Sequence, residues 1–160
     1  MSIGLKVVLA VIGGFVLIAF IGILAALLIP NFLDALQMAK QKRTLADFRD
    51  VGIALNAYAL DNGQFPDVTT IAALSAALEP DYLEAMPRTD GWERPFVYRC
   101  GSGPWGSEGC QGFRLVSAGR DGVFEFDDPW SYEAGLIERG AYDEDLVMAT
   151  EGPLREPAPR

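Results

Sequence analysis

Hydrophobic residues are concentrated at the N-terminal end of the chain. From Val7 to Ile29 the sequence runs for 23 residues without a charged side chain. As a helix rising about 1.5 Å per residue, this run is about 34 Å long, which is enough to cross a bilayer. A cleaved secretory signal has an apolar stretch of only roughly 7–15 residues, and a buried core helix needs a surrounding core that no other segment supplies. The run therefore predicts a transmembrane helix over residues 1–30.

The helical pattern continues beyond Pro30, but only one face stays apolar. The apolar positions recur at steps of three or four residues: Leu45, Phe48, Val51, Leu55 and Tyr58. Charged side chains fall on the other faces, which is typical of an amphipathic helix. Asn62-Gly63 is a common helix stop, because Gly adopts the left-handed conformation after the last turn. The pattern predicts one helix from about residue 3 to about residue 61, half in lipid and half on a globular head.

Shorter elements follow in the head. Thr69 or Thr70 is a suitable N-cap for a short helix, IAALSAAL, ending before Pro80, with a structureless loop as the alternative. Two strand-like runs, residues 96–98 and 113–116, follow a predicted turn at Asp90-Gly91. These elements predict a small head that combines helix and strand.

The chain has two cysteines, Cys100 and Cys110. Their number and spacing fit neither a four-ligand metal cluster nor a CxxC redox pair. A bond between them would close a Gly-rich loop and stabilise the head by about 3 kcal/mol in the loop-entropy model. Two free thiols are the alternative, but small exported domains favour the bond. Because a disulfide needs an oxidising compartment, we expect the N-terminus in the cytoplasm and the head outside it.

Composition and charge exclude several classes of function. The chain has no histidine, which removes His-based acid–base pairs, Ser-His-Asp and Cys-His systems and the usual zinc sites. The net charge of −9 and the pI near 4.4 disfavour nucleic-acid binding. Eleven acidic and three basic side chains lie in residues 121–160, so this segment carries −8 of the net charge. Clustered carboxylates and Gly turns suit Ca²⁺, although a solvated acidic surface is the alternative.

Four segments carry a family resemblance. The blocks IGILAALLIPNF and DALQMAKQKRTLADFRDVGIALNAYALDNGQFPD resemble the N-terminal helix of type IV pilins and, more closely, of the major pseudopilins of type II secretion systems. MPRTDGWERPFVY and FRLVSAGRDG resemble strand segments of the pseudopilin head. The resemblance covers roughly residues 20–130. It implies an α+β, pilin-like fold: a long N-terminal helix, half membrane-spanning and half amphipathic, packed on a small antiparallel β-sheet head over residues 31–150.

The processing site departs from the family pattern. Members of the family are cut by a prepilin peptidase after a Gly, usually before Phe, and carry Glu at the fifth mature position. Gly14-Phe15 matches the dipeptide but places Ala19 fifth, and only 15 residues then precede Pro30. Counting back from Pro30 at the family spacing places Gly13 at the fifth position instead. Neither register supplies the Glu, which in this superfamily is thought to pair with a neighbouring subunit's N-terminal amine.

The resemblance also implies a calcium site after the SxGxDG segment, in which Asp121 matches the first carboxylate. Two pairs are candidates for the remaining ligands: Asp127 with Asp128, or Asp143 with Asp145. The Pro-rich end, residues 151–160, is expected to be disordered.

The leading interpretation of function is a structural subunit of a pseudopilus or type IV pilus-like filament. Its partners would be the membrane, other pilin or pseudopilin subunits and inner-membrane secretion or pilus assembly proteins, with no nucleic acid. The alternative is a non-polymerising, membrane-anchored periplasmic binding or scaffold protein with the same head. The missing Glu favours this alternative, whereas the complete amphipathic helix favours the subunit. An enzyme is disfavoured because no nucleophile–base pair or cofactor loop is evident.

Overall fold

The structure is a computed structural model, and it describes residues 3–101, 109–133, 135–137, 140–150 and 152–157. The chain divides into two compact units, residues 1–36 and residues 37–160, and each is described by itself. The division falls after Leu36, whereas the sequence suggested a boundary after Pro30.

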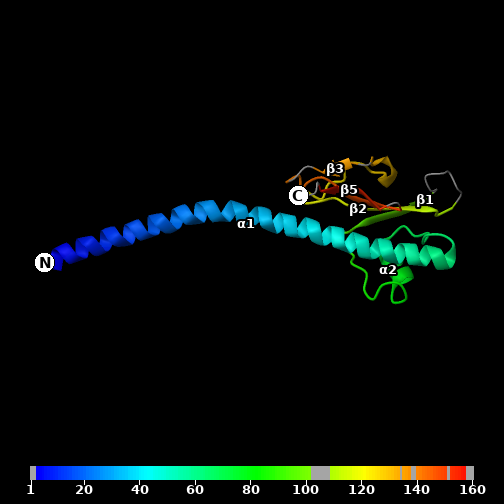
Figure 1. The fold of residues 1–160 in the computed structure, drawn as a ribbon, viewed down its shortest axis with the longest axis horizontal. Helices are drawn as coiled ribbons and strands as arrows, with labels where there is room; N and C mark the ends of the chain where they lie inside the picture. The colour runs from blue at the N-terminus through cyan, green and yellow to red at the C-terminus, as the bar shows by residue number, and fades with distance from the viewer. Residues whose placement is uncertain (1–2, 102–108, 134, 138–139, 151, 158–160) are drawn as a thin grey trace. The chain divides into compact units, whose positions relative to one another are not determined.

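Helix α1 spans Ile3–Asn62 and passes from the first unit into the second (Figure 1). Both ends agree closely with the prediction from the sequence. Over the described residues from Ala10 onward, α1 is long and apolar enough to cross a membrane, and its most apolar stretch is not buried by protein. The helix ends at Gly63, whose φ of 77° and N–H bond to the Ala59 carbonyl (2.8 Å) confirm the predicted stop.

A five-stranded sheet forms the other layer of the second unit. Its strands are β1 (Val97–Gly101), β2 (Gly112–Ser117), β3 (Gly135–Ile137), β4 (Leu146–Ala149) and β5 (Gly152–Pro157), in the spatial order β1-β2-β4-β5-β3. Adjacent strands are antiparallel except β3 and β5, which are parallel. The structure differs from the sequence-based expectation at the C-terminal end: residues 152–157 form a strand rather than a disordered tail.

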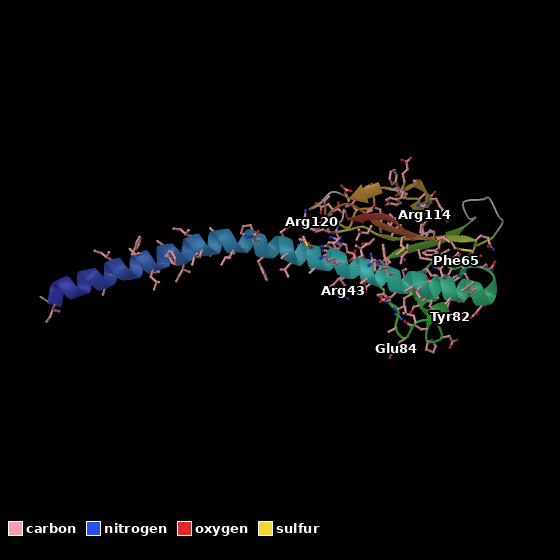
Figure 2. The ribbon with its side chains drawn as sticks, viewed as in Figure 1. Arg43, Phe65, Tyr82, Glu84, Arg114 and Arg120 are labelled. Carbon is pink, nitrogen blue, oxygen red and sulfur yellow. A yellow bond between two sulfur atoms is a disulfide. The ribbon has the colours of Figure 1, made fainter. Side chains whose placement is uncertain are left out.

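The core of the head lies between α1 and the sheet, and the predicted apolar face of α1 supplies part of it. Phe48, Val51 and Leu55 are fully buried and belong to one hydrophobic cluster with strand residues such as Phe113 and Leu146. Each such side chain stabilises the fold by roughly 1.5–3 kcal/mol on burial. Figure 2 shows Arg114 and Arg120 on the sheet side of α1, with Tyr82 and Glu84 on the other side of the helix.

The segment between α1 and β1 carries helix α2, Ile71–Leu78. Thr70 is the N-cap, and its hydroxyl oxygen accepts a hydrogen bond from the Ala73 N–H at 3.2 Å. Leu74 and Leu78 are fully buried in the same core. The helical alternative for IAALSAAL is therefore the correct one.

Candidate functional site

The predicted Asp90-Gly91 turn is held by a buried carboxylate. Asp90 Oδ1 accepts hydrogen bonds from the backbone N–H groups of Trp92 (2.8 Å) and Arg94 (2.9 Å). Its other oxygen accepts a hydrogen bond from the Ser117 hydroxyl at 2.6 Å, at the end of β2. Because all these partners are fixed, Asp90 joins the turn of residues 90–94 to the sheet.

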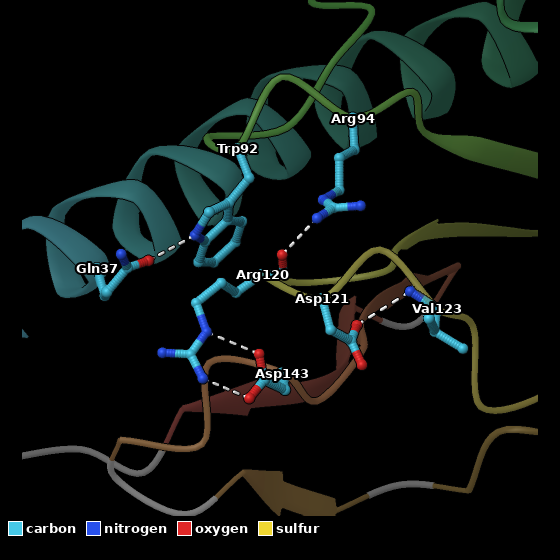
Figure 3. A network of polar contacts seen from close by, with 7 residues as sticks. All are labelled: Gln37, Trp92, Arg94, Arg120, Asp121, Val123 and Asp143. Atoms are coloured by element: carbon cyan, nitrogen blue, oxygen red, sulfur yellow. Dashed lines mark hydrogen bonds and ion pairs between the residues drawn. The ribbon is translucent and has the colours of Figure 1, made fainter.

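The same turn is bound to α1. The Gly91 N–H donates to the Thr44 hydroxyl oxygen at 2.9 Å, and the Trp92 indole N–H donates to Gln37 Oε1 at 2.7 Å (Figure 3). Gly91 lies so close to the helix that a Cβ atom there would be 2.3 Å from the carbonyl oxygen of Lys40. The turn of residues 90–94 therefore fixes the sheet to the first part of α1 in the head.

An ion pair lies beside this turn, in the loop after β2. Arg94 donates to the backbone carbonyl of Arg120 at 2.6 Å. The Arg120 guanidinium donates two hydrogen bonds to Asp143, at 2.8 and 2.5 Å (Figure 3). These bonds lower the pKa of the Asp143 carboxyl. Asp143, one of the predicted metal ligands, is thus already paired with a cation.

Asp145, unlike Asp143, has no cationic partner among the described residues. It is fully buried, and its Oδ2 accepts hydrogen bonds from the Glu125 N–H at 2.8 Å and from the Tyr132 hydroxyl. Its Oδ1 is buried with no hydrogen-bond partner in the part of the chain that the structure describes. Burial raises the pKa of the Asp145 carboxyl, and repulsion from Glu125 and Asp121 raises it further. The site therefore holds a carboxylate oxygen that lacks a partner, within reach of two more negative charges.

The other predicted ligands are exposed. Asp121 Oδ1 accepts a hydrogen bond from the Val123 N–H at 3.0 Å (Figure 3). Asp128 caps the short 3₁₀ helix Pro129–Ser131 by accepting from the Trp130 N–H at 3.1 Å. In the described ranges, no hydrogen bond or ion pair joins Asp127 or Asp128 to Asp121. The structure thus brings Asp121 toward Asp145, together with Glu125, which the sequence analysis missed because nothing in its spacing marks it.

The two cysteines are joined. Cys100 and Cys110 form a disulfide with their Cα atoms 5.1 Å apart, and the described residues contain no free cysteine. Asp67 lies beside them, with its carboxylate 3.6 Å from Cys100 Sγ. Asp67, Cys100 and Cys110 together have the residue types of a metal site. However, metals bind the thiolate, and bonded sulfurs carry none, so this cluster does not form such a site.

The residues of the possible processing site lie within α1. Gly14 and Phe15 are helical, and Phe15 is 78% exposed. Gly13 and Ala19, the two candidates for the fifth mature position, are also helical and exposed.

The fold defines the class of protein. One N-terminal helix that is apolar and exposed in its first part, and packed on a small sheet in its second, is the architecture of a pilin-like protein. Residues 31–128 match the family described as "Type II secretion system (T2SS), protein G", and the chain belongs to this family.

Relatives in several bacteria carry the same name, "Type II secretion system core protein G". The protein of Dickeya chrysanthemi is 33% identical over 69% of this chain and 67% of its own length. That of Aeromonas hydrophila is 29% identical over 82% of this chain and 83% of its own length. That of Escherichia coli K12 is 31% identical over 69% and 71%, respectively. These matches confirm the resemblance to pseudopilins.

Proposed function

We propose that the chain is a structural subunit of a type II secretion pseudopilus. In this proposal α1 anchors it in the bacterial inner membrane as a single-pass protein, with the N-terminus in the cytoplasm and the head in the periplasm or, within a filament, outside the cell. Helix α1 is the observation that carries the proposal, because its first part exposes large apolar side chains, among them Phe15, Ile18 and Phe20. Such a surface is covered only in a bilayer or in a bundle of similar helices.

The partners of the subunit follow from the same helix and from the relatives. We expect the membrane, further copies of the chain, other pseudopilins and inner-membrane assembly proteins to contact it. We assign it no catalytic role. A non-polymerising scaffold is the less favoured function, because the family match includes both α1 beyond Pro30 and the head.

The processing site remains a prediction. Cleavage between Gly14 and Phe15 leaves 15 residues before Pro30, whereas a start near Leu9 keeps a longer apolar helix. Neither product has a Glu at the fifth position, so we expect assembly to use another charge arrangement or neighbouring subunits that retain the Glu. Mass spectrometry of the protein from native membranes determines its N-terminal residue directly.

Membrane insertion is tested by carbonate extraction of membranes, and assembly is tested by recovery of the chain in sheared filaments. When cells produce the chain without the other secretion components, we expect it to stay in the membrane pellet after carbonate extraction. When the complete machinery is present, we expect it in filaments sheared from the cells. Recovery in the soluble fraction would contradict the membrane anchor, and a membrane-bound chain that never enters filaments would support the scaffold function instead.

We further propose that Ca²⁺ binds in the loop beginning at Asp121, held by Asp121 and Asp145. The unpartnered Oδ1 of buried Asp145 supports this, since a buried carboxylate oxygen is costly without a partner. A divalent cation would also offset the repulsion among Asp121, Glu125 and Asp145. Asp143 is a weaker candidate because Arg120 already neutralises it. Asp127 and Asp128 stay as alternative ligands.

Calcium is expected to stabilise the head. A ligand that binds only the folded form adds about 2.7 kcal/mol at a hundredfold excess over Kd. The full chain in detergent should therefore melt at a higher temperature in excess Ca²⁺ than in EGTA, and Asp121→Ala should abolish this difference. Asp143→Ala is the matched control and should keep it, because Arg120 already pairs with Asp143. Asp128→Ala tests the alternative ligand set: it should abolish the difference only if Asp128 binds the ion. Identical melting curves in Ca²⁺ and EGTA would leave a solvated acidic surface as the explanation.

A further inference from the structure

Helix α1 presents an exposed apolar row on the head. Its members are spaced by seven residues, so they lie nearly above one another on one face of the helix. The row consists of Ala39, Ala46, Ile53 and Leu60. Ile53 is 70% exposed and Leu60 is 86% exposed, which is unusual for large apolar side chains on a folded head. We call these four residues the α1 row.

The α1 row has two exposed basic neighbours on one side. Lys42 and Arg49 follow Ala39 and Ala46 by three residues, so they border the row on one side. Both are exposed, and neither side chain forms a hydrogen bond or ion pair within the described part of the chain. In contrast, Arg43 on the other side is paired with Asp47 at 3.7 Å.

A second exposed apolar surface lies in the loop after β2. Val123, Phe124 and Phe126 are 65%, 37% and 44% exposed, respectively. They alternate with acidic side chains in residues 123–128, a segment that we call the aromatic loop. Its acidic members are Glu125, Asp127 and Asp128, all exposed. The aromatic loop therefore combines apolar contact area with negative charge.

The aromatic loop is held in place from within the head. The Glu125 N–H donates to Asp145, and the Phe126 ring packs edge-on against Tyr132 with centroids 5.0 Å apart. These contacts fix the backbone while Val123 and Phe124 stay exposed. A surface that is fixed before binding loses less entropy when it forms an interface.

The α1 row and the aromatic loop cannot meet within one chain. The row lies on the face of α1 opposite to Phe48, Val51 and Leu55, which pack on the core beneath the sheet. The aromatic loop follows β2 and is hydrogen-bonded to Asp145, the residue before β4, so it lies on the sheet side. The exposed apolar side chains of the two surfaces therefore lie on opposite sides of the head.

We propose that the aromatic loop of one copy contacts the α1 row of a second copy. Val123 and Phe124 then cover Ile53 and its apolar neighbours, and Asp127 approaches Arg49. Apolar surfaces match, and the basic border formed by Lys42 and Arg49 is opposite in sign to the acidic loop, which favours this pairing over contacts between two like surfaces; Asp50 lies on the other border of the row. Because two different surfaces of the chain are joined, a row of copies has one free α1 row at one end and one free aromatic loop at the other. This head-to-tail arrangement is the one that an open helical filament requires. This inference rests on the proposed function as a filament subunit.

The contact is tested by cross-linking between two differently tagged copies in cells that contain the complete secretion machinery. One copy carries Ile53→Cys and the other carries Phe124→Cys. A short bismaleimide reacts with these two introduced thiols. It does not react with Cys100 and Cys110, because they form a disulfide. We expect a cross-linked dimer that contains both tags. Glu84→Cys, at an exposed position outside both surfaces, is the matched control and should give no dimer with either partner.

Charge reversal gives an independent measurement. Arg49→Asp should reduce the amount of sheared filament at least severalfold, and Asp127→Arg in the same chain should restore most of it. Both residues are exposed, so neither change disturbs the core. Filaments that form normally without the mixed dimer, or an Ile53→Cys copy that cross-links only to its own kind, would overturn the contact while leaving the proposed function intact. Absence of any filament from the unaltered chain would refute the proposed function and, with it, this inference.

Discussion

Replacement of Gly91 by alanine is expected to destabilise the head by about 3 kcal/mol, because there is no room for a side chain beside α1. A Cβ atom at this position would lie 2.3, 2.8 and 2.9 Å from the carbonyl oxygen, carbonyl carbon and Cα of Lys40. All three are backbone atoms of a helix, so they cannot rotate away. The turn must instead move, and the bond from the Gly91 N–H to Thr44 is lost with it.

Gly52→Ala is the matched control for this prediction. Gly52 lies inside α1, and the nearest atoms to its added Cβ belong to the Met148 side chain at 4.0 Å, an ordinary contact distance. Since glycine costs about 0.5–1 kcal/mol relative to alanine inside a helix, this change should stabilise the head. Urea unfolding followed by tryptophan fluorescence measures both variants. If the Gly91→Ala variant and the unaltered chain were equally stable, the turn of residues 90–94 would not be packed tightly against α1.

The second large effect is expected from the disulfide. Replacing both Cys100 and Cys110 by alanine should lower the free energy of unfolding by about 3 kcal/mol, because the unfolded chain regains the freedom of an open loop. Cys110 is buried, and its carbonyl accepts a hydrogen bond from the Phe65 N–H at 2.8 Å. By holding Cys110 in place, the disulfide also stabilises the segment around Phe65 that follows α1.

Alanine is chosen at these positions because a serine hydroxyl would be buried at position 110 without a designed partner. The unaltered chain, measured with and without a reductant, provides the control: reduction should bring its unfolding midpoint close to that of the double variant. The double variant itself should not respond to the reductant. If reduction leaves the unaltered chain as stable as before, the disulfide contributes little to the head.

The elements that could be predicted from the sequence are those specified by local pattern. The limits of α1 follow from its apolar run and from Gly63, and α2 follows from its cap Thr70. Strand β5 could not be predicted, because its Pro-rich sequence is typical of disorder and only pairing with β4 and β3 makes it a strand. Local sequence does not encode such pairing.

The candidate metal site shows the same limit. Asp143 and Asp145 are equivalent as sequence, two acidic residues before an apolar run. The structure separates them through distant partners, Arg120 for Asp143 and Tyr132 with the Glu125 backbone for Asp145. The binding of the Asp90 turn to Ser117 and Thr44 likewise joins segments far apart in the sequence.

The close approach of Gly91 to Lys40 has a mechanical consequence. A helix advances about 1.5 Å and turns by 100° per residue, so sliding the sheet along α1 by one residue would bring a different side chain under the turn. The bonds from Gly91 to Thr44 and from Trp92 to Gln37 lie in the first turns of α1 within the head. Tension along α1 therefore reaches the sheet first at these bonds and loads them in shear, before it reaches the apolar core around Phe48 and Leu55.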